Sequence, residues 1–141
     1  MQWLDQLIKR WRAEPVELLP GERAEAVIAA FQTFGVHPTD DVIALYGRIG
    51  GMTVMDSAYW RLWPLAEIAS GDQQNAAERG VVFSDYCISC WEYRLKPNVS
   101  GGSAVYLEEY DARAPSLVAP SLEAFFAMYV ANADALLCQG A

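Results

Sequence analysis

Histidine and cysteine are scarce in this sequence. It contains one histidine, His37, and three cysteines among 141 residues. A histidine metal site or a Ser-His relay would have to be built around that single imidazole, which precedes Pro38 at an expected helix entry, so we expect a cap or surface role for it. The cysteines are too few and too unevenly spaced for the disulfide framework of a secreted miniprotein, and we expect reduced thiols.

Basic residues and long apolar runs are also scarce. The 10 Lys and Arg residues are outnumbered by 18 Asp and Glu residues, which gives a formal net charge of -8. Binding to a phosphate backbone normally needs clustered basic side chains, so we expect no direct contact with nucleic acid. No apolar run approaches the ~18 residues of a membrane-spanning helix, and Asp5, Lys9 and Arg10 interrupt the apolar start of the chain. We therefore expect a cytoplasmic protein without a membrane span.

Three short motifs resemble known sites without fitting them. Gly50-Gly51 and Gly101-Gly102 lack the spacing and the following Lys-Ser/Thr of a phosphate-binding loop, so we interpret them as a helix end and a hairpin turn. Cys87-Ile88-Ser89-Cys90 falls within an expected strand, where side chains three residues apart point to opposite faces. We interpret these two cysteines as buried small apolar residues. The sequence predicts no cofactor, no metal and no small-molecule ligand.

Apolar residues at three- and four-residue steps predict four helices. The first ends at Pro15 and is expected to pack against the domain rather than on a membrane surface. The second runs from about residues 20–22 to Gly35, and the third from an N-cap at Thr39 to Gly50. A terminal amphipathic helix of about four turns is expected to begin near Ser121, its N-cap.

Short aromatic and β-branched runs between these helices predict an antiparallel sheet. Val105 and Leu107 are expected in the core, with Tyr106, Glu108 and Tyr110 partly exposed. The result is a single α+β domain over residues 1–141, with N-terminal helices, a central mainly antiparallel sheet and the C-terminal helix packed on it. The expected strands are 59–64, 80–84, 86–96 and 104–110, with a helical turn at 65–69, a loop or short exposed helix at 72–79, a turn at 97–103 and an irregular exit at 112–120.

Five segments carry a resemblance to a known family. They are 40–51 (DDVIALYGRIGG), 62–68 (LWPLAEI), 80–85 (GVVFSD), 104–106 (AVY) and 118–126 (VAPSLEAFF). In their order and spacing the chain resembles the SUKH superfamily over about residues 38–137. That superfamily groups fungal cell-wall synthesis regulators, the translocon-associated protein Syd and many bacterial immunity proteins that neutralise toxins. The resemblance implies a non-enzymatic adaptor whose sheet and adjoining loops form a binding surface.

The acidic second half of the chain fits two interpretations, a surface that binds a basic partner or charge that only keeps the protein in solution. From Trp63 onward, four basic residues stand against ten Asp and Glu residues, so a basic partner would be steered there. Tyr and Trp are over-represented at interface hot spots, and we expect two or three of the strand-region aromatics to reach the surface. The predicted partner-binding residues are Trp60, Asp85, Glu108, Glu109, Tyr110 and Asp111.

The leading interpretation is an immunity-type protein that binds and neutralises a cognate bacterial toxin, with a basic toxin domain as its partner. A membrane- or translocon-associated adaptor like Syd is one alternative. A hydrolase is the other, in which two carboxyl groups drawn from Asp85, Glu92, Glu108, Glu109 and Asp111 would act as acid and base. Because such a pair needs one desolvated carboxyl group and the sequence indicates an exposed rim, we expect a protein that is not an enzyme.

Overall fold

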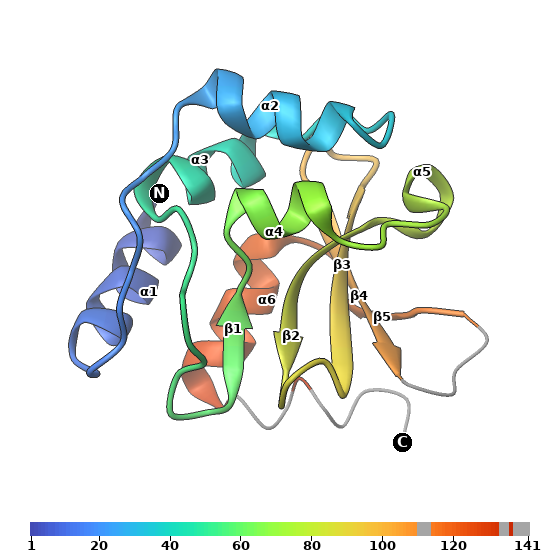
Figure 1. The fold of residues 1–141 in the computed structure, drawn as a ribbon. Helices are drawn as coiled ribbons and strands as arrows, with labels where there is room; N and C mark the ends of the chain where they lie inside the picture. The colour runs from blue at the N-terminus through green and yellow to red at the C-terminus, as the bar shows by residue number, and fades with distance from the viewer. Residues whose placement is uncertain (110–113, 133–135, 137–141) are drawn as a thin grey trace.

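Strand alternation and helical periodicity produce an α+β fold in the computed structural model, which describes residues 1–109, 114–132 and 136 (Figure 1). Within these residues, five strands form one antiparallel sheet whose spatial order follows the chain. The strands are β1 (Trp60–Leu62), β2 (Val81–Tyr86), β3 (Trp91–Pro97), β4 (Ser103–Glu109) and β5 (Ser116–Ala119). The α+β prediction is therefore confirmed.

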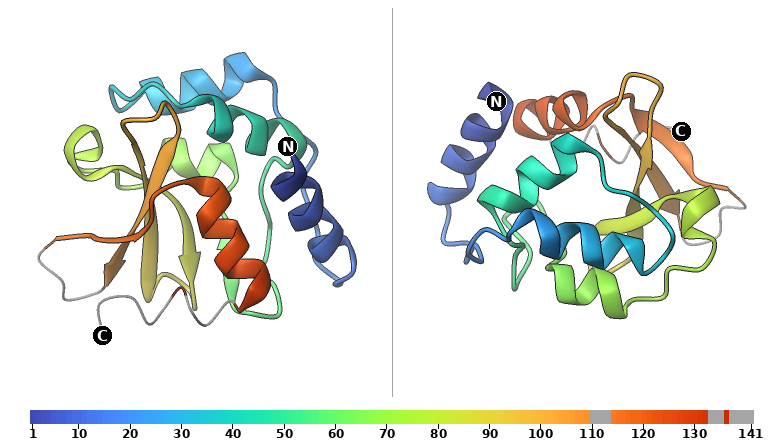
Figure 2. Two further views of the ribbon diagram at one scale, coloured as in Figure 1. Left: turned by 180° about the vertical axis from the view of Figure 1, so that it is seen from behind. Right: turned by 90° about the horizontal axis from the view of Figure 1, so that it is seen from above.

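Helices cover one face and one end of this sheet. α6 packs against β4, β5 and α1, while α2 packs against α3 and α4 across the end of the sheet (Figure 2). None of the helices in the described residues has both the length and the apolar character needed to cross a membrane. The helices are α1 (Gln2–Arg12), α2 (Ala24–Gln32), α3 (Asp40–Arg48), α4 (Leu65–Ser70), α5 (Ala76–Arg79) and α6 (Leu122–Ala131).

Trp60 lies at the centre of the core between β1 and α6. Its indole is 1% exposed. Five aromatic rings surround it with centroid distances of 5.2 to 6.4 Å, and they belong to Trp11, Phe83, Phe125, Phe126 and Tyr129. The prediction that Trp60 contacts a partner is therefore wrong, because β1 turns this side chain toward α6.

Helix α1 is held to the core by apolar packing and by one indole. Leu4, Leu7, Ile8 and Trp11 are buried, which confirms that α1 packs against the domain. The Trp11 indole N–H donates to the Tyr129 hydroxyl at 2.9 Å and to the Asp56 carboxylate at 3.3 Å. These bonds link α1, α6 and the segment that leads into β1.

The predicted starts of the third and the terminal helix agree with the structure, whereas the other predicted helix ends do not. α2 begins at Ala24 rather than at 20–22, and α1, α2 and α3 end at Arg12, Gln32 and Arg48, before the predicted ends at residues 15, 35 and 50. Ser121 accepts a hydrogen bond from the Ala124 backbone N–H at 3.1 Å and caps α6. Thr39 occupies the N-cap position of α3, but its hydroxyl donates to Asp41 and contacts the Ser103 hydroxyl instead of accepting a bond from the first turn. α6 ends at Ala131, earlier than four turns would require. Beyond α6, Leu136 is buried, and residues 133–135 and 137–141 lie outside the described residues.

The strand prediction for residues 86–96 is wrong at its start. Residues 87–90 form a turn between β2 and β3, and Cys87 and Cys90 are exposed rather than buried. This turn is hard to predict from the sequence, because residues 87–89 adopt left-handed conformations and the turn contains no glycine, proline, asparagine or aspartate.

The end of the sheet also differs from expectation, since residues 116–119 form β5 where an irregular segment was predicted. Within the part of the chain that the structure describes, β5 pairs with β4 alone. Prolines 115 and 120 flank it, and proline is tolerated beside an edge strand. Val105 and Leu107 on β4 are buried and Tyr106 and Glu108 are partly exposed, as the alternation predicts, while Tyr110 lies outside the described residues.

We expect Trp11→Phe to lower the free energy of unfolding by about 1–3 kcal/mol, because it deprives buried Asp56 and Tyr129 of a hydrogen-bond donor. Trp3→Phe is the matched control, since Trp3 also lies on α1 and stacks on Phe126 with its ring centroid 5.7 Å away. Urea denaturation followed by circular dichroism measures both variants. Equal losses for the two exchanges would contradict a specific role for the Trp11 hydrogen bonds.

Candidate binding cleft

A row of charged side chains crosses four strands on the sheet face turned away from α6. The antiparallel register sets Arg61 opposite Asp85, Asp85 opposite Glu92, and Glu92 opposite Glu108. Directly opposite residues in antiparallel strands point to the same face with their Cβ atoms about 5 Å apart, so like charges there repel. Three neighbouring carboxyl groups beside one guanidinium therefore need further stabilisation.

Asp85 obtains that stabilisation from its neighbours and is 5% exposed. Its carboxylate accepts hydrogen bonds from the Trp63 indole N–H at 3.0 Å and the Ser89 hydroxyl at 3.1 Å. The Arg61 guanidinium lies 3.7 Å away and also binds the carboxylate of Glu67. The prediction that Asp85 contacts a partner is therefore wrong, because a buried carboxylate with these donors positions other residues instead.

Glu108 is held by two arginines. Its carboxylate pairs with Arg94 Nε and lies 3.3 Å from the Arg79 guanidinium. Arg94 is 5% exposed and also donates to the Gly80 carbonyl at 2.7 Å. Burial acts to raise the pKa of Glu108, but hydrogen bonds and charge from Arg94 and Arg79 outweigh it and lower the pKa below its ordinary value. Glu108 is thus held ionised within a network that carries one net positive charge.

Glu92 has no such support. It is half-buried and forms no hydrogen bond or ion pair with any residue in the described part of the chain. Burial raises its pKa, and repulsion from Glu108, Asp85 and Asp72 raises it further, while Arg94 only partly opposes these effects. The negative charge of the row that is not neutralised by an ion pair is therefore concentrated at Glu92.

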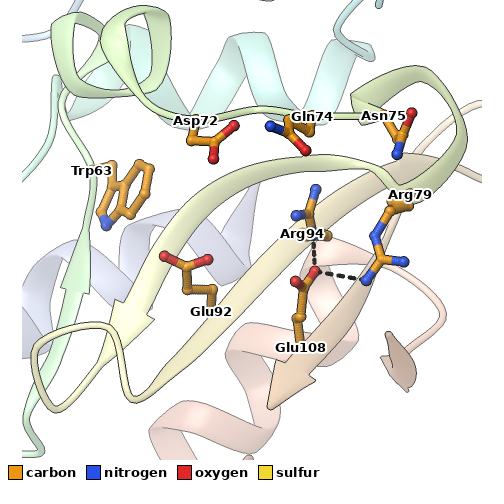
Figure 3. A pocket seen from close by; sticks show the side chains of 8 residues that line it. All are labelled: Trp63, Asp72, Gln74, Asn75, Arg79, Glu92, Arg94 and Glu108. Atoms are coloured by element: carbon orange, nitrogen blue, oxygen red, sulfur yellow. Dashed lines mark hydrogen bonds and ion pairs between the residues drawn. The ribbon is translucent and has the colours of Figure 1, made fainter. Parts of the chain in front are cut away.

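Above this row lies a polar cleft of about 490 Å³. Its floor comes from β3 and β4, and its roof is the segment 72–79 that runs from α4 into α5 (Figure 3). Trp63, Asp72 and Glu92 stand at one end, whereas Arg79 and Glu108 meet at the other. The lining residues are Trp63, Asp72, Gln74, Asn75, Arg79, Glu92, Arg94 and Glu108.

The roof is fixed to the sheet by the side chain of Gln73. Its amide donates to the Val82 carbonyl at 3.0 Å and accepts from the Val82 N–H at 2.9 Å, so a side chain occupies the place of a neighbouring strand. Gly80, with φ of 97°, lets the chain enter β2 where a Cβ would meet the Leu95 carbonyl oxygen at 2.7 Å. Residues 72–79 were expected to be a loop or short exposed helix, and α5 with its preceding loop confirms this.

The predicted contact residues divide into four groups. Glu108 lines the cleft, whereas Glu109 is exposed at the end of β4 and does not. Trp60 and Asp85 are buried, and Tyr110 and Asp111 lie outside the described residues. The expected exposed acidic rim is confirmed at Glu109 and wrong at Glu108 and Glu92, because arginines neutralise Glu108 and Glu92 lies in a cleft. Sequence reasoning missed five lining residues, namely Asp72, Gln74, Asn75, Arg79 and Arg94.

An aromatic end lies beside the acidic row, and we define it as Tyr59, Tyr86, Ile88 and Trp91. Tyr59 is 57% exposed, with φ of 62°, and its ring meets Tyr86 edge-on at 6.4 Å. Tyr86 in turn contacts Trp91 at 5.3 Å. Two or three of the five aromatics Tyr59, Trp60, Trp63, Tyr86 and Trp91 were expected to reach the surface. Tyr59 is exposed, Trp60 is buried, and the other three are half-buried.

The cleft has the chemistry of a recognition site for a polar, positively charged group. Residues 1–109, 114–132 and 136 contain no group of three or more His, Cys, Asp or Glu side chains arranged to hold a metal ion. Asp72 and Glu92 offer carboxylates beside the Trp63 ring, and aromatic faces attract cations. A lysine or arginine side chain would find complementary charge there.

We expect Glu92→Gln and Glu108→Gln to change stability in opposite directions at neutral pH. Ionised Glu92 costs more in the folded state, so its replacement stabilises the fold, and the gain fades as pH falls toward the ordinary pKa of 4.5. Glu108 stabilises the fold above that value and loses this effect as pH falls through its lowered pKa, so Glu108→Gln destabilises at neutral pH and approaches wild type in acid.

Urea unfolding at a series of pH values between about 3 and 7 measures these differences. The control is Glu109→Gln, an exposed position on the same strand as Glu108, for which we expect little change at any pH. A stabilising effect of Glu92→Gln that persists undiminished in acid would show that the charge of Glu92 is not its cause.

No model of a known protein family matches the chain, and no curated protein sequence matches it. The resemblance to the SUKH superfamily therefore remains a prediction. The function has to be argued from the cleft itself.

Proposed function

We propose that the protein is a non-enzymatic binding protein that receives a basic segment of a partner protein in the cleft between β3, β4 and residues 72–79. The observation that carries this proposal is the Glu92 carboxylate, which is half-buried in a polar cleft without a hydrogen-bonded or ion-paired partner among the described residues. A cation placed there would remove a repulsion that no hydrogen bond or ion pair of Glu92 relieves within the described residues.

The charge balance of the cleft supports the sign of the ligand. Asp72, Glu92 and Glu108 contribute three carboxylates, against two guanidinium groups from Arg79 and Arg94. Both guanidinium groups are directed to Glu108, so the excess negative charge lies at the end formed by Asp72 and Glu92. Desolvated charge pairs of this kind give specificity, and the acidic character of the chain accelerates encounter with a basic partner.

The aromatic end extends this surface beyond the cleft. Exposed tyrosine and tryptophan rings supply large contact areas at low entropic cost, which is why they recur at interface hot spots. Tyr59 keeps a left-handed backbone conformation at this end, and such conformations cluster at functional sites. We include Glu109 at the rim, because it is exposed and lies opposite Trp91 in the register.

The partner that we propose is a bacterial toxin domain, which makes the protein an immunity protein. Three features support this: the resemblance to the SUKH superfamily, the net charge of -8, and a cleft whose arginines are already engaged by a carboxylate. An immunity protein acts by covering its toxin, so preorganised complementary charge is sufficient for its function.

Binding by the partner should depend on Glu92 more than on overall charge. With a partner recovered by pull-down from the source lysate, we expect Glu92→Gln to weaken the Kd at least about tenfold, equivalent to ~1.4 kcal/mol. Glu123→Gln on α6 removes the same charge from the opposite side of the sheet and should leave the Kd nearly unchanged. Isothermal titration calorimetry measures both.

The same exchange separates folding from binding, because Glu92→Gln is expected to stabilise the fold while it weakens the complex. Equal Kd values for wild type and Glu92→Gln would reject the cleft as the contact site. A gene for a large toxin immediately upstream would support the immunity role independently of any variant.

A carboxylate-dependent hydrolase is the second candidate. Glu92 and Glu108 stand opposite each other on β3 and β4 and their pKa values move apart, which is the pattern of an acid–base pair. The two guanidinium groups on Glu108 weigh against it, since they hold the carboxylate that would act as base or nucleophile. Continuous heat release from a glycoside or peptide, lost in Glu92→Gln, would support hydrolysis, whereas saturable heat without turnover supports binding.

A further inference from the structure

The turn between β2 and β3 has an unusual backbone. Cys87, Ile88 and Ser89 have φ values of 53°, 55° and 63°, three consecutive left-handed residues without a glycine. Each such residue costs roughly 1–2 kcal/mol, and runs of them are rare. Ile88 is branched at Cβ and 79% exposed, so burial of its side chain does not compensate. The left-handed backbone of this turn is therefore unfavourable, and side-chain burial does not explain why the protein has it.

One effect of this shape is to bring two thiols together. The Cys90 N–H donates to the Cys87 carbonyl at 3.4 Å and closes a four-residue turn. Such a turn holds its first and last Cα atoms within about 7 Å, and disulfides span Cα separations of about 4.4–6.8 Å. Both cysteines are free and exposed.

We propose that Cys87 and Cys90 form a reversible dithiol–disulfide site that reacts with small-molecule disulfides such as oxidised glutathione. The Cys87 thiolate attacks one sulfur of glutathione disulfide, forms a mixed disulfide and releases one glutathione thiolate. The Cys90 thiolate then attacks the Cys87 sulfur of the mixed disulfide and releases the second glutathione thiolate. Two protons and two electrons leave the protein, and one disulfide is reduced to two thiols.

The order of attack follows from the surroundings of the two thiols. Desolvation raises the pKa of Cys90, and its hydrogen bond with Cys87 and the charge of that residue raise the pKa further. Because the thiolate is the nucleophile, a raised pKa leaves a smaller share of Cys90 ready to begin the exchange. Once the mixed disulfide has formed at Cys87, Cys90 is already in place to resolve it.

The site is connected to the cleft through Ser89, which lies between the two cysteines in the sequence. The Ser89 hydroxyl donates to Asp85 Oδ2 at 3.1 Å, and the same oxygen accepts the Trp63 indole N–H at 3.0 Å. Trp63 lines the cleft. A disulfide would constrain the turn around Ser89 and thereby alter the environment of Trp63. This inference goes beyond the proposed function and does not depend on the identity of a partner.

Glutathione redox buffers of graded ratio test the site in the full chain. After acid quenching and alkylation, peptide mapping by mass spectrometry should show that Cys87 and Cys90 together lose two hydrogens and escape alkylation, and that a reductant reverses this. Cys138→Ser should behave like wild type, whereas Cys87→Ser and Cys90→Ser should not form the internal disulfide. Two alkylated thiols at residues 87 and 90 in the most oxidising buffer, or a disulfide that involves Cys138 instead, would overturn the proposal.

Tryptophan fluorescence tests the connection to the cleft. We expect oxidation to shift the emission of wild type, and the shift to be lost in Trp63→Phe and reduced in Ser89→Ala, which lacks the hydroxyl bound to Asp85. Mass spectrometry on the same samples verifies that each variant still forms the disulfide. An identical emission shift in Trp63→Phe would reject the proposed connection.

Discussion

The burial of Trp60 determines which face of the sheet packs in the core and which face carries the charged row. Side chains alternate along a strand, so an indole packed among the rings of α1 and α6 forces Arg61 onto the opposite face. The antiparallel register then aligns Arg61 with Asp85, Glu92 and Glu108 in a single row. A slip of one residue would exchange the aromatic core for the charged face, and the cost of burying that row makes the observed register the stable one.

The charged face is not a uniform acidic surface. Asp85 is enclosed by an indole, a hydroxyl and a guanidinium, and Glu108 is held by two arginines, so both are satisfied within the fold. Glu92 lies between them and has no equivalent partner in the described residues. Folding has therefore concentrated an unfavourable charge at one position in a cleft, which is the kind of local conflict that recurs at binding sites.

Local patterns predicted the parts of this structure that depend on neighbours in the sequence. The cap at Ser121, the burial of Val105 and Leu107 and the packing of α1 follow from periodicities of a few residues. The cleft could not be predicted in that way, because Arg79, Glu108 and the side-chain anchor at Gln73 come together only through long-range pairing. The burial of Trp60 was missed because alternation identifies two faces and does not say which one α6 will cover. Asp85 lies on the other face, and its burial depends on Trp63 and Arg61, which only the pairing of β1 with β2 brings to it.

The anchorage of residues 72–79 has a consequence for how recognition can diversify on this scaffold. Gln73 takes the place of a strand by forming two hydrogen bonds to Val82. The strand pairings β1–β2, β2–β3 and β3–β4 therefore include no residue of 72–79. Changes at the exposed positions Asp72, Gln74 and Asn75 would alter the roof of the cleft while the strands of its floor keep their pairing. Ligand preference thus depends on residues 72–79, whereas fold stability depends on the paired strands. The ligand preference can therefore change while the fold keeps its stability.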